Sequence, residues 1–259
     1  MILLLGGASE TKSVATALME AGFETLVSMA TDNELDIGEG PGVTRRTGRL
    51  SETGFIKLIE ENGVAALVDA AHPFATAAHD TAKNAAKNAV IPYFRLERPG
   101  SKYDYDKIHY ADDHEHAAQI AAGLGKAVLL TTGSRNLWPY VAAVQTSGTK
   151  LVARVLPHAE SEDAVKKAGL ADAKVIYARG PFTVEENLEV IREHGIGVIV
   201  TKDSGAAGGV PEKIESARAA GIDMVIVKRP ELEAEAFSTV ADLVAAVKET
   251  LMKARLDGR

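Results

Sequence analysis

The chain has 259 residues, a length that suits two α/β domains of roughly 100–150 residues each. Its 29 basic and 36 acidic residues give a formal net charge of −7, which argues against a general binder of nucleic acid or of a membrane surface. Cysteine is absent, which excludes disulfides, thiolate metal sites, cysteine-ligated iron–sulfur clusters and cysteine nucleophiles. The opening apolar run MILLL is too short for a signal peptide or a membrane span, so we expect a cytoplasmic protein.

Short unbroken apolar runs recur along the chain and alternate with stretches of helical periodicity. Unbroken runs are typical of parallel strands covered on both faces, and their alternation with single helices indicates βαβ units. The sequence therefore predicts an α/β fold with parallel sheets. The predicted strands are Ile2–Leu5, Glu24–Ser28, Ala65–Asp69, Ile91–Leu96, Ala127–Thr131, Lys150–Val155, Lys174–Ala178, Gly197–Thr201 and Asp223–Lys228.

The stretch Arg98–Asp106 interrupts this alternation with proline, glycine and polar residues, which favours a domain boundary. We expect an N-terminal domain over residues 1–100 and a C-terminal domain over residues 101–259, the latter ending in a helix over Thr239–Lys253. No uncovered apolar stripe is evident, so monomer and homodimer both remain open.

An internal similarity relates the two halves. Gly48–Val68 aligns with Gly180–Val200 at a constant offset of 132, with identical residues at five positions. Chance similarity between two amphipathic βα units is the alternative. We interpret the offset as a duplication, which predicts two similar lobes and a ligand cleft between them at the carboxyl ends of their strands.

A glycine-containing loop follows the first predicted strand and precedes the helix predicted over Thr11–Ala21. Glycines allow the backbone to approach a pyrophosphate, and a helix N-terminus offers N–H groups and a positive dipole end. The complete G-x-G-x-x-G pattern is missing, so a plain βα turn is the alternative. The candidate cofactor-binding residues here are Gly6, Gly7, Ala8, Ser9 and Glu10, with Ser9 as a helix cap or a phosphate donor.

Two features near the second strand bear on the choice between NADH and NADPH. Asp32 lies 25 residues after Gly7, later than the usual ribose-binding acid. Three arginines follow at positions 45, 46 and 49 and could neutralise a 2′-phosphate, although a solvated basic edge explains them equally. We expect NADPH, with NADH open, and candidate contacts from Ser28, Ala30, Thr31, Arg45 and Arg49.

A histidine stands directly after the strand predicted over Ala65–Asp69, where α/β sheets bind ligands. His72 could donate a proton or bind the cofactor, while a satisfied histidine in a turn is the alternative. We include His72, Pro73 and Phe74 among the candidate cofactor contacts. The run Asp112–His116 is rich in acids and histidines, but its spacing suits a helix N-terminus better than a metal site, and we propose no metal.

In the second half, four cations lie at or near the carboxyl ends of predicted strands in an otherwise acidic chain. Scattered surface charge is the alternative to a pocket for a polyanionic ligand at one sheet edge. The candidate substrate-binding residues are Thr132, Gly133, Ser134, Arg135, Arg154, Arg179, Gly180, Pro181, Phe182, Lys202, Ser204 and Gly205.

Nine segments spread along the chain form a recognisable set. They are LLLGGASE, GRL, DAAHPFA, YFRLERP, LLTTGSRNL, ARVLP, RGPF, VTKDSG and VIVKRP, beginning at residues 3, 48, 69, 93, 129, 153, 179, 200 and 225. In this order they resemble the precorrin-6A reductase family of cobalamin biosynthesis, including its cobalt-precorrin-6A branch. The chain departs from the family's usual pattern at Ala8 and Ala71, where threonine is common, and at Gly205-Ala206, where a double glycine is common.

The resemblance implies two Rossmann-like lobes, with the cofactor on the first and the substrate on the second. It implies a nicotinamide-dependent reduction of one carbon–carbon double bond in ring D of precorrin-6A, without flavin or metal. Because that macrocycle carries acetate and propionate groups, Arg135, Arg154, Arg179 and Lys202 gain a role as a carboxylate clamp. Lys202, Asp203 and His72 are the candidate proton donors or orienting groups, with ordered water or solvent as alternatives. A different NAD(P)-dependent reductase and a non-catalytic dinucleotide sensor are the competing hypotheses.

Overall fold

The computed structural model describes residues 1–31, 36–38, 40–97, 100, 102–171, 174–230 and 236–256. The chain divides into two compact units, which are described separately. The first unit combines Met1–Pro99 with Glu231–Arg259, and the second is Gly100–Pro230. Among the described residues, no helix is both long and apolar enough to cross a membrane.

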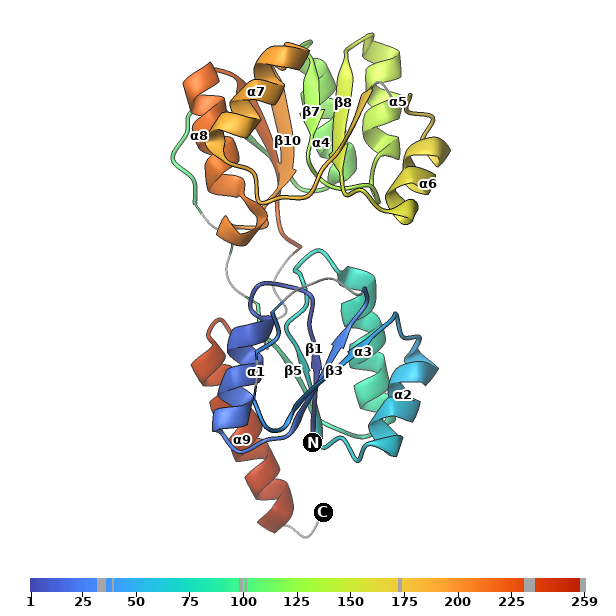
Figure 1. Cartoon of the computed structure of the whole chain (residues 1–259), viewed down its shortest axis with the longest axis vertical. Helices are drawn as coiled ribbons and strands as arrows, with labels where there is room; N and C mark the ends of the chain where they lie inside the picture. Colours follow the sequence, from blue (N-terminus) through green and yellow to red (C-terminus); the bar gives the residue numbers. More distant parts are fainter. Residues whose placement is uncertain are drawn as a thin grey trace. The chain divides into compact units, whose positions relative to one another are not determined.

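The first unit is a five-stranded parallel sheet with helices on both faces. Its strands are β1 (Ile2–Leu5), β2 (Thr25–Met29), β3 (Val43–Thr47), β4 (Ala66–Asp69) and β5 (Tyr93–Arg95), in the order β3-β2-β1-β4-β5. Helices α1 (Thr11–Glu20) and α9 (Val240–Leu256) cover one face, and α2 (Glu52–Glu61) and α3 (Thr76–Asn88) cover the other (Figure 1). The central strands β1 and β4 are buried along their whole length, as the unbroken apolar runs predicted.

The second unit is a six-stranded parallel sheet in the order β6-β11-β10-β7-β8-β9. Helix α4 contacts α5, and α7 contacts α8. The strands are β6 (Ile108–Ala111), β7 (Val128–Leu130), β8 (Leu151–Val155), β9 (Val175–Tyr177), β10 (Val198–Lys202) and β11 (Asp223–Val227). The helices are α4 (His114–Gly123), α5 (Trp138–Ser147), α6 (Ala159–Lys167), α7 (Val184–His194), the 3₁₀ turn η2 (Ala206–Gly208) and α8 (Val210–Ala220).

The two sheets share a topology. The order β3-β2-β1-β4-β5 corresponds position by position to β9-β8-β7-β10-β11, and β6 is the extra strand of the second sheet. The similar segments Gly48–Val68 and Gly180–Val200 contain the equivalent helices α2 and α7 and run into the equivalent strands β4 and β10. Two Rossmann-like parallel-sheet units are thus confirmed, and their common strand order supports the predicted duplication. The cleft between them stays a prediction.

The C-terminal segment corrects the expected domain boundary, because it completes the first unit rather than the second. Phe237 forms a parallel bridge with Leu96 beyond β5. Leu243 and Val247 of α9 are fully buried in the same core cluster as Val14 of α1. An amphipathic pattern shows which side of a helix is apolar, but it does not show which sheet that side covers.

Strands β3 and β6 were not predicted from the sequence. Most residues of β3 are exposed and those of β6 are mostly partly exposed, so neither forms the unbroken apolar run by which the other strands were found. Both lie at the edge of their sheet. The predicted strand Asp223–Lys228 corresponds to β11, which pairs within the second unit with β10 and β6.

Candidate functional site

The glycine loop after β1 has the backbone shape of an anion-binding turn. Gly7 has φ +115°, a conformation that favours glycine, and a Cβ at Gly6 would lie 2.7 Å from Thr11 Cγ2. The Thr11 hydroxyl closes the turn by accepting a hydrogen bond from Gly7 N (3.0 Å) and donating one to Ala8 O (2.7 Å). The loop therefore places the backbone of Gly7, with open space around its Cβ position, next to the start of α1.

Among the residues that the structure describes, no side chain caps the N-terminus of α1, so its positive end can attract an anion. Glu10 occupies the N-cap position. The Ser9 hydroxyl instead donates to Glu10 Oε2 at 2.8 Å. The prediction that Ser9 caps the helix was therefore wrong, because Ser9 stands one residue before the N-cap position. Its role as a phosphate donor stays a prediction.

The neighbouring strand ends are held together by an arginine. Arg46 on β3 pairs in register with Ser28 on β2, and its Nη1 donates to Ser28 Oγ (2.8 Å) and to Gly48 O (2.9 Å). Burial lowers the pKa of Arg46 from its ordinary value. Arg45 and Arg49 are exposed on the same segment, as are Ala30 and Thr31 after β2. Arg46 therefore has a structural role. Asp32, the acid considered for ribose binding, lies outside the described residues.

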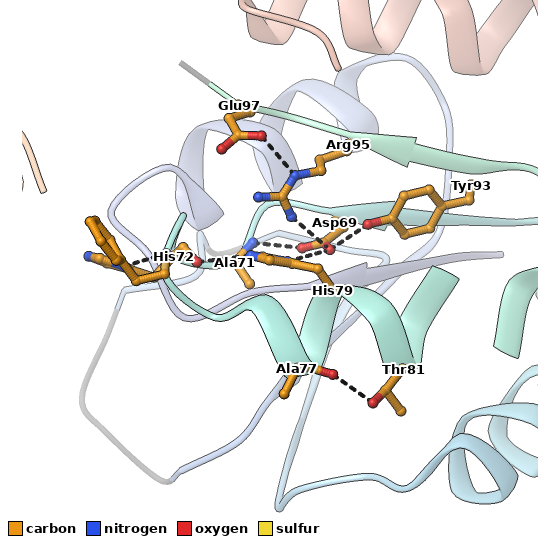
Figure 2. A network of polar contacts seen from close by, with 10 residues as sticks. Asp69, Ala71, His72, Ala77, His79, Thr81, Tyr93, Arg95 and Glu97 are labelled. Carbon is orange, nitrogen blue, oxygen red and sulfur yellow. Dashed lines mark hydrogen bonds and ion pairs between the residues drawn. The ribbon is translucent and has the colours of Figure 1, made fainter. Parts of the chain in front are cut away.

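A buried carboxylate organises the loop after β4. Asp69 is fully buried and its Oδ2 accepts hydrogen bonds from His79 Nδ1 (2.8 Å), the Tyr93 hydroxyl (2.7 Å) and Arg95 Nη1 (3.3 Å) (Figure 2). Arg95 Nε in turn donates to Glu97 Oε2 at 3.1 Å. Burial raises the pKa of Asp69, but the hydrogen bonds from His79 and Tyr93 and the charges of His79 and Arg95 outweigh it and lower that pKa overall.

This network reaches the candidate cofactor contact His72 through its backbone. His79 Nε2 lies 3.1 Å from His72 O, while His79 Nδ1 lies against Asp69. Both partners are acceptors, so both bonds form together only when both ring nitrogens carry hydrogen. The His72 ring accepts a hydrogen bond from Phe74 N at 3.3 Å. The network thus fixes the turn from His72 through Pro73 to Phe74 at the edge where β4 ends.

The second unit contains a cavity of about 380 Å³ at the carboxyl ends of β7, β8 and β9. Arg154 lines it, together with Gly133, Gly180, Pro181 and Phe182 of the predicted substrate set. Its lining does not include Arg135, Arg179 or Lys202. Arg135 and Arg179 are exposed and Lys202 is partly buried, so the four predicted cations do not form one cluster in this cavity.

Lys202 is the last residue of β10, and its charge interacts with Arg135 and His114. Burial lowers the pKa of Lys202, and the positive charge of Arg135 lowers it further. His114, at the start of α4, has its pKa lowered to about 4 by burial and by the charge of Lys202. His114 was not among the predicted site residues, because the run Asp112–His116 predicted a helix N-terminus. The Asp113 side chain, which caps α4, confirms that helix start.

Asp203 holds its own loop in place. Its carboxylate accepts a hydrogen bond from Tyr103 at 2.7 Å, and Arg229 Nε donates to its backbone oxygen at 2.8 Å. Ser204 Oγ and Gly205, which has φ +69°, follow in the same turn. Asp203 is therefore placed as an anchor, and its predicted catalytic role has no geometric support beyond its position after β10.

Two further predicted residues follow β7. The Thr132 hydroxyl is buried without a hydrogen-bond partner among the described residues, and Ser134 Oγ donates to Ser161 Oγ at 3.3 Å. A buried cation that the sequence reading missed, Lys213, also lines the cavity. Among the described residues, no group of three or more acidic or histidine side chains could hold a metal ion.

Asp69→Asn tests the buried network through stability. A carboxylate whose pKa is lowered on folding contributes stability above its unfolded pKa of about 3.9, and this contribution is lost as pH falls through the folded pKa. At neutral pH we expect the substitution to cost about 3–5 kcal/mol. We also expect a shallower loss of stability with acidification than in the wild type. Native-state hydrogen exchange of β1 and β4 amides measures the unfolding free energy of this unit.

The matched variant Tyr93→Phe removes one hydrogen bond and keeps the charge, so it should cost about 1 kcal/mol. Because that hydrogen bond is one of several causes that lower the Asp69 pKa, the loss of stability with acidification should be only slightly shallower than in the wild type. An unchanged acid slope in Asp69→Asn would contradict this account of the network.

Comparison with known proteins places the whole chain in one group. The family model described as Precorrin-6x reductase CbiJ/CobK matches residues 1–248. The chain is 35% identical over 249 residues to the cobalt-precorrin-6A reductase of Priestia megaterium, which covers 95% of this chain and 98% of that protein. It is 32% identical over 260 residues to the precorrin-6A reductase of Rhodococcus erythropolis, with 95% of each covered. A solved structure of CobK precorrin-6A reductase matches with a TM-score of 0.75 at 26% identity over 96% of both chains. The chain therefore belongs to the precorrin-6x reductase family.

Proposed function

We infer that this protein reduces one carbon–carbon double bond of precorrin-6A, or of its cobalt-containing form, to the precorrin-6B level in cobalamin biosynthesis. The observation that carries this inference is the family match over residues 1–248, together with relatives of both branches that align over nearly their full length. The two parallel-sheet units and the open glycine loop suit a reductase that takes a nicotinamide cofactor.

The first unit is the proposed cofactor domain. The residues of the β1 loop fit a pyrophosphate. Counting the described residues alone, no atom lies within 4 Å of a Cβ position at Gly7 and no side chain caps α1. The backbone of Gly6, Gly7 and Ala8, with Ser9, would hold the pyrophosphate. Arg45 and Arg49 would hold the 2′-phosphate that distinguishes NADPH from NADH. When bound, the nicotinamide supplies the hydride.

The second unit is the proposed substrate domain. Arg135, Arg154, Arg179 and Lys202 would bind carboxylates of the macrocycle, and the loops after β7, β9 and β10 would contact its body. Lys202 is the proposed source of the proton, because it stands at the carboxyl end of β10. Burial and the charge of Arg135 lower its pKa, which makes its ammonium a stronger acid. His72 is the second candidate for this role, and the buried network fixes its backbone.

The function is tested by following NADPH absorbance in the presence and absence of a precorrin-6A preparation. We expect oxidation that depends on the macrocycle and yields a product heavier by two hydrogens in mass spectrometry. Running the assay with the metal-free and the cobalt forms separates the two branches. Turnover of simple ketones instead would indicate a different reductase. Binding of NADPH without turnover of either substrate would indicate a dinucleotide sensor.

Single-turnover reduction tests the proton donor. Lys202→Met should slow the chemical step by about 10²- to 10⁴-fold if Lys202 delivers the proton, as for other general acids. His72→Ala is the parallel variant, and NADPH titration of each variant separates lost binding from lost chemistry. Near-normal rates in both variants would show that neither side chain is the acid and would leave solvent or an ordered water as the source.

Gly7→Val tests the cofactor loop. A β-branched residue is strained at φ +115° and would fill the space needed by the pyrophosphate, so NADPH affinity should fall by at least about tenfold. Gly22→Val is the matched control, because Gly22 follows the other end of α1, has φ +87° and is equally open around its Cβ position. An NADPH fluorescence titration in which both variants bind alike would contradict the assignment of this loop.

A further inference from the structure

His79 is a buried histidine to which the proposed function gives no role of its own. It lies in the first turn of α3 with an exposed fraction of 6%, beside the fully buried Asp69. Its ring nitrogens have separate partners, because Nδ1 lies 2.8 Å from Asp69 Oδ2 and Nε2 lies 3.1 Å from His72 O. The ring therefore connects the end of β4 with the backbone of the turn that follows it (Figure 2).

Both partners of the His79 ring accept hydrogen bonds. The carbonyl oxygen of His72 can only accept. Burial opposes the charge of Asp69, but its hydrogen bonds and the neighbouring positive charges lower its pKa, so this carboxyl group is ionised and is an acceptor as well. A neutral imidazole has one N–H and could donate to only one of the two. The two contacts are satisfied together by a ring that carries hydrogen on both nitrogens.

The charges around His79 point to the same state of its ring. Asp69 and Glu97 are two buried carboxylates, and Arg95, which contacts both, supplies one positive charge. Tyr93 adds a hydrogen bond to Asp69 but no charge, because burial and the Asp69 carboxylate raise its pKa and keep its hydroxyl protonated. A second positive charge makes this buried group neutral overall, and the His79 ring can supply it.

The turn after β4 depends on the carbonyl group that His79 holds. His72 O also accepts from Ala75 N at 2.8 Å, so two donors fix its direction. Phe74 N donates to Nδ1 of the His72 ring at 3.3 Å. Because Nδ1 is an acceptor, a neutral His72 ring carries its hydrogen on Nε2. The conformation that His79 holds thus selects one tautomer of His72.

We propose that His79 is a positioning residue of the cofactor site, which holds the carbonyl group of His72 through a ring that carries hydrogen on both nitrogens. This proposal rests on the proposed function, in which the turn from His72 to Phe74 contacts the nicotinamide cofactor. His79 needs no contact with the cofactor, because it acts through the turn. A turn that is fixed before binding loses less conformational freedom when the cofactor arrives, which raises affinity.

The two contacts of His79 can be separated by a matched pair of amide variants. The side-chain nitrogen of asparagine reaches about as far as Nδ1 of histidine, and that of glutamine reaches about as far as Nε2. His79→Asn therefore keeps a donor toward Asp69 and loses the donor toward His72 O. His79→Gln keeps the donor toward His72 O. Both variants remove the same positive charge and leave a neutral amide in the same buried place.

NADPH fluorescence titration compares the two variants. We expect His79→Asn to raise the Kd for NADPH by about tenfold, the equivalent of one hydrogen bond, and His79→Gln to raise it by less than about threefold. Tyr93→Phe is the control that removes a different donor to Asp69 Oδ2, and its Kd should stay close to the wild-type value. A role confined to stabilising Asp69 would affect His79→Gln at least as strongly as His79→Asn. Equal Kd values for these two variants would therefore overturn the proposal.

A proton–nitrogen correlation spectrum of the histidine rings tests the state of His79 in the wild-type protein. At neutral pH we expect both ring nitrogens of His79 to carry hydrogen and the His72 ring to carry it on Nε2. A His79 ring with hydrogen on one nitrogen overturns the proposal. If His79→Asn fails to fold, this spectrum and the titration of His79→Gln decide, and a tenfold weaker affinity of His79→Gln also overturns it.

Failure of the proposed cofactor site itself is recognised separately, as a wild-type protein that does not bind NADPH. In that case the ring signals of His72 replace the titration as the readout. They should shift in His79→Asn and stay close to their wild-type positions in His79→Gln. Identical His72 signals in the two variants would overturn the positioning role.

Discussion

Parallel pairing is the constraint on which both candidate sites depend. Every strand pair within the two sheets is parallel over the described residues. Parallel strands need a crossover after each strand, so all the loops that leave the carboxyl ends gather at one edge of their sheet. The loop beginning at Gly6, the turn at His72 and the loops around Arg154 and Lys202 are placed by this rule, although they are far apart in sequence.

The two units differ in how many partners their buried charged side chains have. In the first, the Asp69 carboxylate is surrounded by donors from His79, Tyr93 and Arg95, and Arg95 also pairs with the buried Glu97. These partners all belong to the unit itself, and the network stabilises a turn. In the second, Arg154 and Lys213 line the same cavity, and Arg154 Nη1 has no hydrogen-bond partner within the described part of the chain. Incomplete neutralisation of buried charge favours ligand binding over stability, since an arriving anion restores the missing interactions.

Strands that are buried on both faces could be predicted from the sequence, whereas edge strands and contacts that depend on tertiary context could not. The central strands are unbroken apolar runs and were predicted closely, whereas β3 and β6 lie at sheet edges and carry no such run. Lys213 was missed because, within a helix of mixed polarity, it has the pattern of a solvent-facing lysine. Its ammonium donates to the carbonyl of Gly208 in the η2 turn, a contact that local sequence does not specify. Arg154 was found because it lies near the carboxyl end of a predicted strand, where α/β sheets bind ligands.

The position of α9 has a consequence for how the fold is assembled. The second unit is inserted between β5 and Phe237, so the first unit is encoded in two pieces separated by more than a hundred residues. Leu243 and Val247 are fully buried against the α1 face of the first sheet, and this core stays uncovered until the last part of the chain has been made. The inserted unit contains all its own strands and can fold before that point. The duplicated topology is therefore compatible with an order of folding in which the proposed substrate domain forms first and the C-terminal helix then closes the proposed cofactor domain.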